Sequence, residues 1–175
     1  MKGEKGVRYT IYVALMAVVI VLCSWISVPF TVPFTMQTFG IFCALLLLGG
    51  RYGTLSVLLY VLLGAVGLPV FSGFNSGVGA LLGPTGGYIL GFVLCALLYW
   101  VFEGRIKDIP LLALGNIVCY LFGTLWFVYV YSSGGKSVSF GAALMLCVVP
   151  YIVPDAIKLL LAAVVARRVK KLIKL

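Results

Sequence analysis

Long uncharged apolar stretches dominate the chain, and short segments rich in glycine, proline and charge separate them. No acidic or basic residue occurs within residues 9–50, 52–102, 109–135 or 137–154. A helix of about 20 apolar residues is long enough to cross a bilayer. The pattern therefore predicts several membrane-spanning helices and leaves no stretch for a water-soluble domain.

Glycine and proline divide these stretches into six predicted helices. Pro29 and Pro33 interrupt the first stretch, the pair Gly49 and Gly50 predicts a tight turn, and Pro154 suits the first turn of the last helix. The predicted fold is an all-α integral membrane bundle of six transmembrane helices, forming one membrane domain over residues 1–175. The predicted helices cover residues 9–28, 36–48, 53–68, 88–102 and 110–131, and a last segment from 154 into the basic tail.

Two further segments are predicted not to span the membrane. Residues 69–87 carry no charge and many glycines, and they predict an outer loop between the third and fourth helices. Irregular backbone near a membrane survives only where protein buries it or where it lines a cavity, so this loop fits a lid over a pocket; simple turns are the alternative. Residues 140–149 are apolar but too short to cross.

Composition supports a membrane protein and assigns its orientation. Hydrophobic residues make up 63% of the chain, charged residues 10%, and mean hydropathy is +1.22, whereas soluble domains are about 25% charged. The net charge of +9 does not indicate nucleic acid binding, because the basic residues lie outside the apolar stretches. The positive-inside rule then places both termini in the cytoplasm of a multi-pass cell-membrane protein, with Lys136 alone on the outer side and eleven basic residues inside: Lys2, Lys5, Arg8, Arg51, Arg105, Lys107, Arg167, Arg168, Lys170, Lys171 and Lys174.

Motifs for nucleotide, metal or hydrolytic chemistry are missing from the sequence. It contains no G-x-x-x-x-G-K-[ST] phosphate loop, no histidine, and five cysteines without a C-x-x-C pair. We therefore expect no cofactor on this chain, no metal site and no enzymatic activity.

Asp155 and Lys158 are the acid and base that fall inside a predicted span. Their spacing of three places them on one helix face, and the cost of charge in lipid directs both toward the bundle interior or a cavity. One interpretation is a purely structural ion pair. We favour the other, in which the two side chains are ligand contacts, because a buried ion pair is weak evidence for stability.

Several uncharged polar side chains are further candidates for the same binding site. Asn75 and Gln37 each offer a hydrogen-bond donor and an acceptor in the predicted outer segments. Tyr88, Tyr120 and Tyr151 combine an apolar ring with one polar tip and are predicted to line a pocket. The alternatives are turn or capping roles for the amides and ordinary packing for the tyrosines.

Three segments together resemble the BioY family, the biotin-binding S components of energy-coupling factor (ECF) transporters. They are VPFTMQT, GLPVFSGFNSGVGALLGPTGGYILGF and PYIVPDAIK, in the expected order and spacing. Pro154 departs from the family pattern, which often has glycine there. The first-helix A-x-x-x-A docking pattern is only approximate, since Val18 stands four residues after Ala14.

The resemblance implies an S component that captures biotin from outside for uptake. Its implied partners are a transmembrane coupling subunit and two cytoplasmic ATPase subunits, which would use the ATP; the implied docking face on the first helix holds Thr10, Ala14 and Val18. Asp155 would accept from a ureido N–H of biotin, while Asn75 or Lys158 would donate to the ureido oxygen, or Lys158 would meet the carboxylate. The alternatives are an S component for another vitamin, a stand-alone ion-coupled transporter using Asp155, and a structural subunit.

Overall fold

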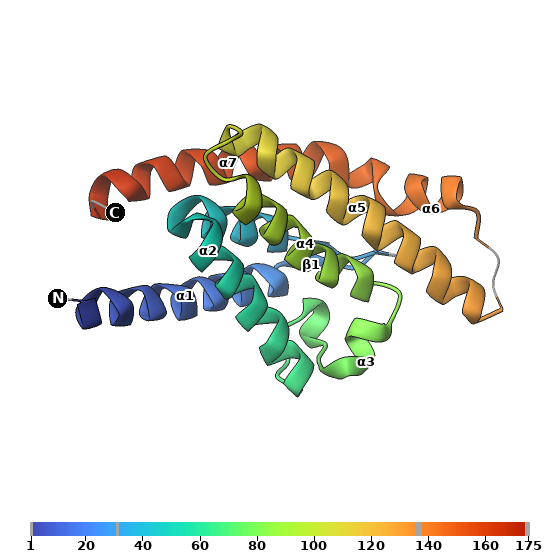
Figure 1. The fold of residues 1–175 in the computed structure, drawn as a ribbon. Helices are drawn as coiled ribbons and strands as arrows, with labels where there is room; N and C mark the ends of the chain where they lie inside the picture. The colour runs from blue at the N-terminus through green and yellow to red at the C-terminus, as the bar shows by residue number, and fades with distance from the viewer. Residues whose placement is uncertain (1, 31, 136–137, 174–175) are drawn as a thin grey trace.

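The structure, a computed structural model, describes residues 2–30, 32–135 and 138–173. Lys136 and Lys174, two residues used to assign orientation from the sequence, lie outside these ranges. The described part folds into an elongated bundle of helices with one small sheet (Figure 1). Its elements are α1 (Lys2–Trp25), β1 (Ser27–Val28), β2 (Phe34–Thr35), α2 (Gln37–Val66), η1 (Ser72–Phe74), α3 (Gly77–Leu82), α4 (Gly86–Phe102), α5 (Asp108–Ser133), α6 (Phe140–Cys147) and α7 (Val149–Ile173).

The helical membrane architecture agrees with the sequence-based prediction. Helices α1, α2, α5 and α7 are long and apolar enough to cross a membrane, and α4 is a shorter apolar helix of 17 residues. Large apolar side chains remain exposed along these helices, for example Leu15, Ile117 and Leu161. Such an exterior suits lipid, because in lipid an apolar surface carries no hydration cost.

The helices predicted over 36–48 and 53–68 belong to one element, α2, with a sharp break at Gly49. This glycine has φ 76° and ψ 174°, a conformation that strongly favours glycine. The chain reverses there: a Cβ on Gly53 would lie 2.8 Å from the Cα of Leu45, and Gln37 at the start of α2 donates to the Tyr60 hydroxyl near its other end. The turn is thus where the glycine pair predicted it. The described residues form seven α-helices, of which α3 and α6 have only six and eight residues.

The predicted start of the last helix is wrong. Helix α7 begins at Val149, and Pro154 lies inside it rather than at its start. The bond that Pro154 removes is the one to the carbonyl of Pro150 in the first turn, so the helix continues through it. Pro29 and Pro33 interrupt the helices as predicted, and they lie between β1 and β2, which pair antiparallel.

The glycine-rich segment predicted as a loop over 69–87 is partly helical. It contains η1 and α3, and its final residues already belong to α4. Gly77 opens α3 with φ 81°, which only glycine adopts readily. The short helix α6, with eight residues, lies within the segment 140–149 that was predicted to be too short to span.

Helices α4 and α5 pack closely because small residues face each other along their contact. A Cβ on Gly91 of α4 would lie 3.1 Å from the Cα of Cys119, and a Cβ on Gly115 of α5 would lie 2.6 Å from the Sγ of Cys95. Small side chains allow such close approach of helix backbones within a membrane. The contact fixes the relative position of the two helices that form one wall of the cavity described below.

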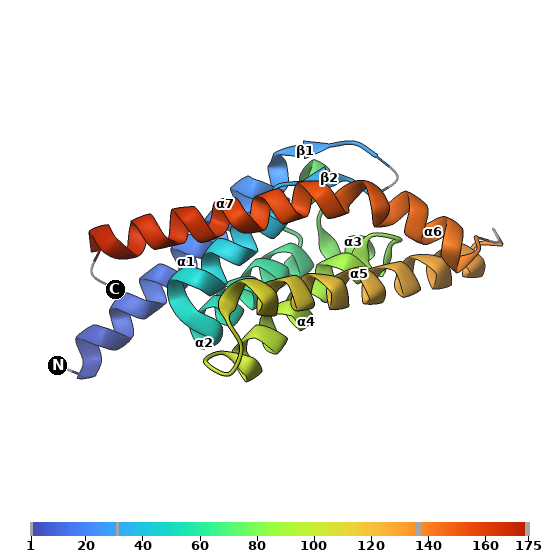
Figure 2. The ribbon, with the colours of Figure 1, turned by 90° about the horizontal axis from the view of Figure 1, so that it is seen from above.

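The turns of the bundle collect at two opposite ends. Helix α1 begins and α7 ends at the same end of the molecule, together with the break in α2 and the α4–α5 turn (Figures 1 and 2). Glu103 connects these last two, since its Oε2 accepts from the backbone N–H of Gly50 at 2.8 Å. The β1–β2 hairpin and the segment between α2 and α4 lie toward the other end, over the cavity.

Candidate functional site

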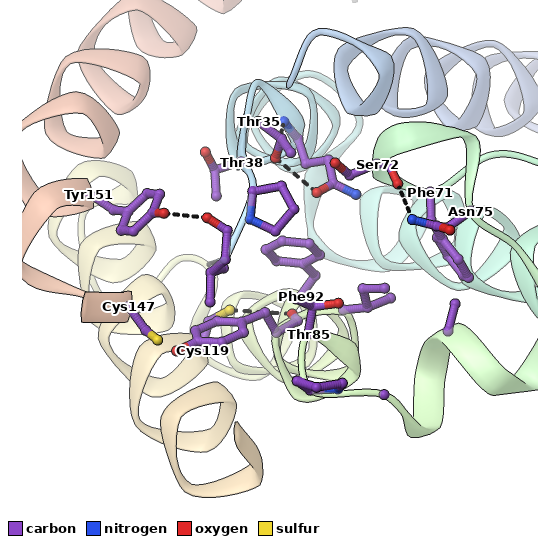
Figure 3. A pocket seen from close by; sticks show the side chains of 18 of the residues that line it. Thr35, Thr38, Phe71, Ser72, Asn75, Thr85, Phe92, Cys119, Cys147 and Tyr151 are labelled. Atoms are coloured by element: carbon purple, nitrogen blue, oxygen red, sulfur yellow. Dashed lines mark hydrogen bonds between the residues drawn. The ribbon is translucent and has the colours of Figure 1, made fainter. Parts of the chain in front are cut away.

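A cavity of about 480 Å³ opens between the hairpin, the segment connecting α2 to α4, and helices α4, α5 and α7. Figure 3 shows side chains from these elements converging on it. Its volume lies in the range of small-molecule sites. Apolar and aromatic side chains form most of the wall, among them Phe71 and Phe92, and polar groups are grouped within it.

Asp155 and Lys158 form an ion pair in the wall of this cavity. Lys158 Nζ lies 2.7 Å from Asp155 Oδ1, and each side chain is 6% exposed or less. Asp155 also accepts from the hydroxyls of Thr38, at 3.0 Å, and of Tyr120. A buried carboxylate is tolerable when it is paired and well supplied with donors, and here three donors serve it.

Lys158 also joins α7 to the β1–β2 hairpin. Its Nζ donates to the carbonyl of Thr35 at 2.6 Å and lies 4.0 Å from the centre of the Phe34 ring, which is cation–π geometry. One turn before Asp155, the hydroxyl of Tyr151 donates to the carbonyl of Val32 (Figure 3). The hairpin is therefore held over the cavity by the same helix that carries the ion pair.

Gln37 occupies a buried hydrogen-bond chain at the start of α2. Its Oε1 accepts from Thr35 Oγ1 at 2.8 Å, and its Nε2 donates to Tyr60. Both ends of the amide are thus engaged within the protein, which orients the side chain and leaves limited capacity for a ligand.

The structure brings all seven predicted binding residues to one cavity. Asp155, Lys158, Asn75, Gln37, Tyr88, Tyr120 and Tyr151 all line it. Their polar atoms differ in availability. The Tyr88 hydroxyl lies 3.0 Å from Thr124 Oγ1. Asn75 is exposed, and one of its amide N–H groups donates to the carbonyl of Ser72 at 2.9 Å (Figure 3).

Further polar residues of the cavity were not selected from the sequence. Thr35 and Thr38 flank Gln37 in VPFTMQT, and a threonine near a candidate amide carries little signal of its own. Asn116 carried a stronger one, since it is the sole amide in the uncharged stretch 109–135. A lone amide in a predicted span is costly unless it faces protein or a cavity, and Asn116 lines this cavity.

Two tryptophans hold the segment that covers the cavity. Trp25 at the end of α1 donates to the carbonyl of Pro69, and Trp126 on α5 donates to the carbonyl of Gly83, each at 3.0 Å. Between these points the Phe71 ring is buried against Gly64, where no Cβ would fit. The segment is thus held by hydrogen bonds at Pro69 and Gly83 and by the packing of Phe71.

The predicted docking residues lie apart from the cavity. Thr10, Ala14 and Val18 are all exposed on one face of α1, and none lines the site. The opposite face of α1 is buried, with Met16, Ile20 and their neighbours in the core.

The groups in the cavity wall indicate what the cavity can hold. Within residues 6–30, 32–135 and 138–172, no group of three or more His, Cys, Asp or Glu side chains is placed to hold a metal ion. What the walls supply is one carboxylate, one ammonium, amides, hydroxyls and aromatic rings. This set fits a small molecule with both an apolar body and several hydrogen-bonding groups.

Comparison with known proteins gives concordant matches over nearly the whole chain. The profile of the BioY family matches residues 1–175. A probable biotin transporter BioY of Pyrococcus horikoshii is 39% identical over 171 residues, covering 97% of this chain and 98% of that protein. The biotin transporter BioY of Thermotoga maritima is 38% identical over 170 residues, covering 94% and 97%.

A solved structure shares the fold. The crystal structure of the S-component for biotin from an ECF-type ABC transporter superposes with a TM-score of 0.86 at 29% identity. The match covers 98% of this chain and 95% of the other. The similarity therefore includes the hairpin and the covering segment as well as the long helices.

Proposed function

The chain belongs to the BioY family, and on that premise we propose that it captures biotin for uptake as the substrate-specific membrane subunit of an ECF transporter. The observation that carries this proposal is the cavity in which the buried Asp155–Lys158 pair meets the amide and tyrosine side chains. The family is one of transporters, and the chain is not an enzyme.

The cavity has the chemistry that biotin requires. Biotin combines a ureido ring with two N–H donors and one carbonyl, an apolar sulfur ring, and a carboxylate tail. Asp155 can accept from a ureido N–H, and Lys158 can donate to the ureido oxygen or to the carboxylate. Asn75 lies on the covering segment and can donate its free N–H, while aromatic side chains such as Tyr88 and Phe92 enclose the apolar part.

The assignment of the remaining predicted contacts follows from their hydrogen bonds. Tyr120 orients Asp155, and Tyr151 and Gln37 shape the wall through Val32 and Tyr60. We therefore propose that these three side chains act on biotin chiefly by positioning the charged pair and the hairpin.

The proposed topology has six passes with both termini in the cytoplasm of the cell. Because the chain reverses at Gly49, α2 makes two passes in this topology. Helices α1, α4, α5 and α7 each make one more, which gives six. An even number agrees with α1 beginning and α7 ending at one end of the bundle (Figure 1). Accessibility of tags at both ends tests this: a terminus labelled from outside intact cells would contradict it.

The proposed partners are those of an ECF transporter: a transmembrane coupling subunit and two cytoplasmic ATPase subunits that use ATP. The chain itself has no phosphate loop, so ATP-driven uptake requires other subunits. The exposed face of Thr10, Ala14 and Val18 is the proposed contact with the coupling subunit.

A binding titration of the purified protein against a panel of vitamins tests the proposed ligand. We expect saturable binding of biotin and none of riboflavin, thiamine or folate. Preferential binding of another vitamin would assign the chain to a different substrate. Uptake in vesicles that lack the ATPase subunits, abolished by a protonophore, would indicate a stand-alone ion-coupled transporter instead.

A further inference from the structure

Asn116 lies deep in the cavity wall, away from the covering segment. It is half-buried in α5, lines the cavity, and precedes Tyr120 by four residues, so both share one helix face. Trp126, which holds Gly83 of the covering segment, stands ten residues further along α5, roughly 15 Å at the rise of an α-helix. Asn116 is therefore at the opposite end of this wall from the cover.

The other polar side chains at this depth already have partners in the protein. The Asp155 carboxylate accepts hydrogen bonds from Thr38, Tyr120 and Lys158. Lys158 also donates to the Thr35 carbonyl. Gln37 is engaged at both ends of its amide. The Asn116 carboxamide lies beside the Tyr120 hydroxyl on the same helix face, and a bond from one amide N–H to that hydroxyl leaves the amide oxygen and the other N–H for a ligand.

An amide with two donors and an acceptor in a transmembrane helix is expensive unless it meets a partner. On the basis of the proposed function, we infer that Asn116 is a specificity-determining residue that pairs with the ureido group of biotin. In a five-membered cyclic urea, each N–H points to the same side as the carbonyl oxygen beside it. A carboxamide presents the complementary acceptor and donor side by side, so two parallel hydrogen bonds join the groups.

This pairing places the ureido ring at the closed end of the cavity. Tyr120 lies one helical turn along α5 from Asn116, and its hydroxyl donates to Asp155 of α7. Asp155 is then positioned to accept from the second ureido N–H. The carboxylate tail of biotin extends toward the covering segment, where Asn75 and Ser72 lie (Figure 3). Asn116 thus determines which ring the site accepts, and the residues of the cover contact the tail.

Ligand analogues that change one end of biotin test this assignment. Asn116→Leu keeps the size of the side chain and removes its polar atoms. Because two neutral hydrogen bonds are lost, the affinity for biotin should fall about tenfold or more. Desthiobiotin keeps the cyclic urea, so the affinity of the leucine variant for it should fall by the same factor. In 2-iminobiotin, a protonated guanidinium replaces the urea and offers donors alone. Asn116→Asp should therefore shift the preference toward 2-iminobiotin by at least about tenfold, since a carboxylate pairs with a guanidinium.

Ile117→Ala is the matched control, because Ile117 is the next residue of α5 and its side chain is exposed. It should bind all three ligands as the parent does. Parental biotin affinity in Asn116→Leu would overturn the inference, as would an unchanged ratio of biotin to 2-iminobiotin in Asn116→Asp, which remains decisive if the leucine variant does not fold. Absence of biotin binding in the parent would overturn the proposed function itself, and the inference with it.

Discussion

The Nζ of Lys158 lies 2.7 Å from Oδ1 of Asp155, so the two buried charges of α7 bind each other directly. The sequence favoured separate ligand contacts over an ion pair. The structure shows that both side chains are in the pair and in the cavity wall at once. A ligand at this site therefore has to share or redirect hydrogen bonds that Asp155 and Lys158 already make with Thr38 and Thr35.

Single and double replacements of this pair should separate stability from binding. Asp155→Leu or Lys158→Met alone leaves a buried charge without its partner, and each should cost about 3–5 kcal/mol of unfolding free energy. The double variant removes both charges and should recover most of that loss. Because we propose that both groups contact biotin, it should nevertheless bind biotin at least about tenfold more weakly, since a hydrogen bond to a charged group contributes about 1.5–3 kcal/mol.

Thermal unfolding in detergent and titration with biotin measure the two effects on the same samples. Asp155→Asn is a milder variant that keeps size and polarity, and it too should bind biotin at least about tenfold more weakly. A stable double variant with parental affinity would show that the pair serves structure alone.

The contact of α4 with α5 gives a second prediction, on stability. A Cβ at Gly91 would meet Cys119 Sγ at 2.8 Å and its Cα at 3.1 Å, so Gly91→Ala forces the helices apart. Overpacking of this kind should cost about 1–3 kcal/mol. Gly141→Ala is the matched control, because a Cβ there meets nothing within 4 Å, and its melting temperature should equal or exceed that of the parent. Equal melting temperatures for the two variants would mean that α4 and α5 adjust freely.

Much of the architecture could be predicted because charged and helix-breaking residues delimit the helices along the sequence. Gly49 marks the reversal inside α2, and the uncharged stretches mark the helices. The candidate site was accessible for the same reason, since Asp155 and Lys158 are conspicuous in an apolar span. Partial helicity between residues 69 and 87 was not accessible, because its glycines suggest turns and only tertiary contacts such as Phe71 against Gly64 order it.

The start of α7 and the pairing inside the cavity required the structure. Proline is common at the start of a helix, yet α7 begins at Val149, and the five residues 149–153 form its first turn ahead of Pro154. Lys158 donating to the Thr35 carbonyl joins positions 123 residues apart. A contact between positions so distant in the chain leaves no trace in local periodicity.

The exposed face of α1 gives a third prediction, on assembly. Ala14→Trp places a large ring among Thr10 and Val18, where we propose the coupling subunit packs, and it should weaken co-purification with that subunit severalfold. Biotin affinity of the isolated chain should not change, because none of these residues lines the cavity. Ile117→Trp adds the same ring to an exposed position on α5 and should assemble normally. Equal loss of assembly in both variants would place the contact elsewhere.

The two indole hydrogen bonds to the covering segment give the last prediction, on kinetics. Trp25→Phe and Trp126→Phe keep an aromatic ring but remove the N–H that reaches Pro69 or Gly83. A neutral hydrogen bond contributes about 0.5–1.5 kcal/mol, so each change should let the segment open more often. Biotin should dissociate about two- to tenfold faster from either variant. Phe71 still anchors the start of the segment against Gly64, and biotin should therefore still bind.

Trp100→Phe is the matched control for these two variants. Its ring is also partly exposed, and its indole donates no hydrogen bond within the described ranges of the chain. Hydrogen exchange of the amides in residues 70–82 should accelerate in Trp25→Phe and Trp126→Phe and stay at the parental rate in Trp100→Phe. Exchange and dissociation that are unchanged in all three variants would mean that packing of Phe71, rather than the indole hydrogen bonds, keeps the segment over the cavity.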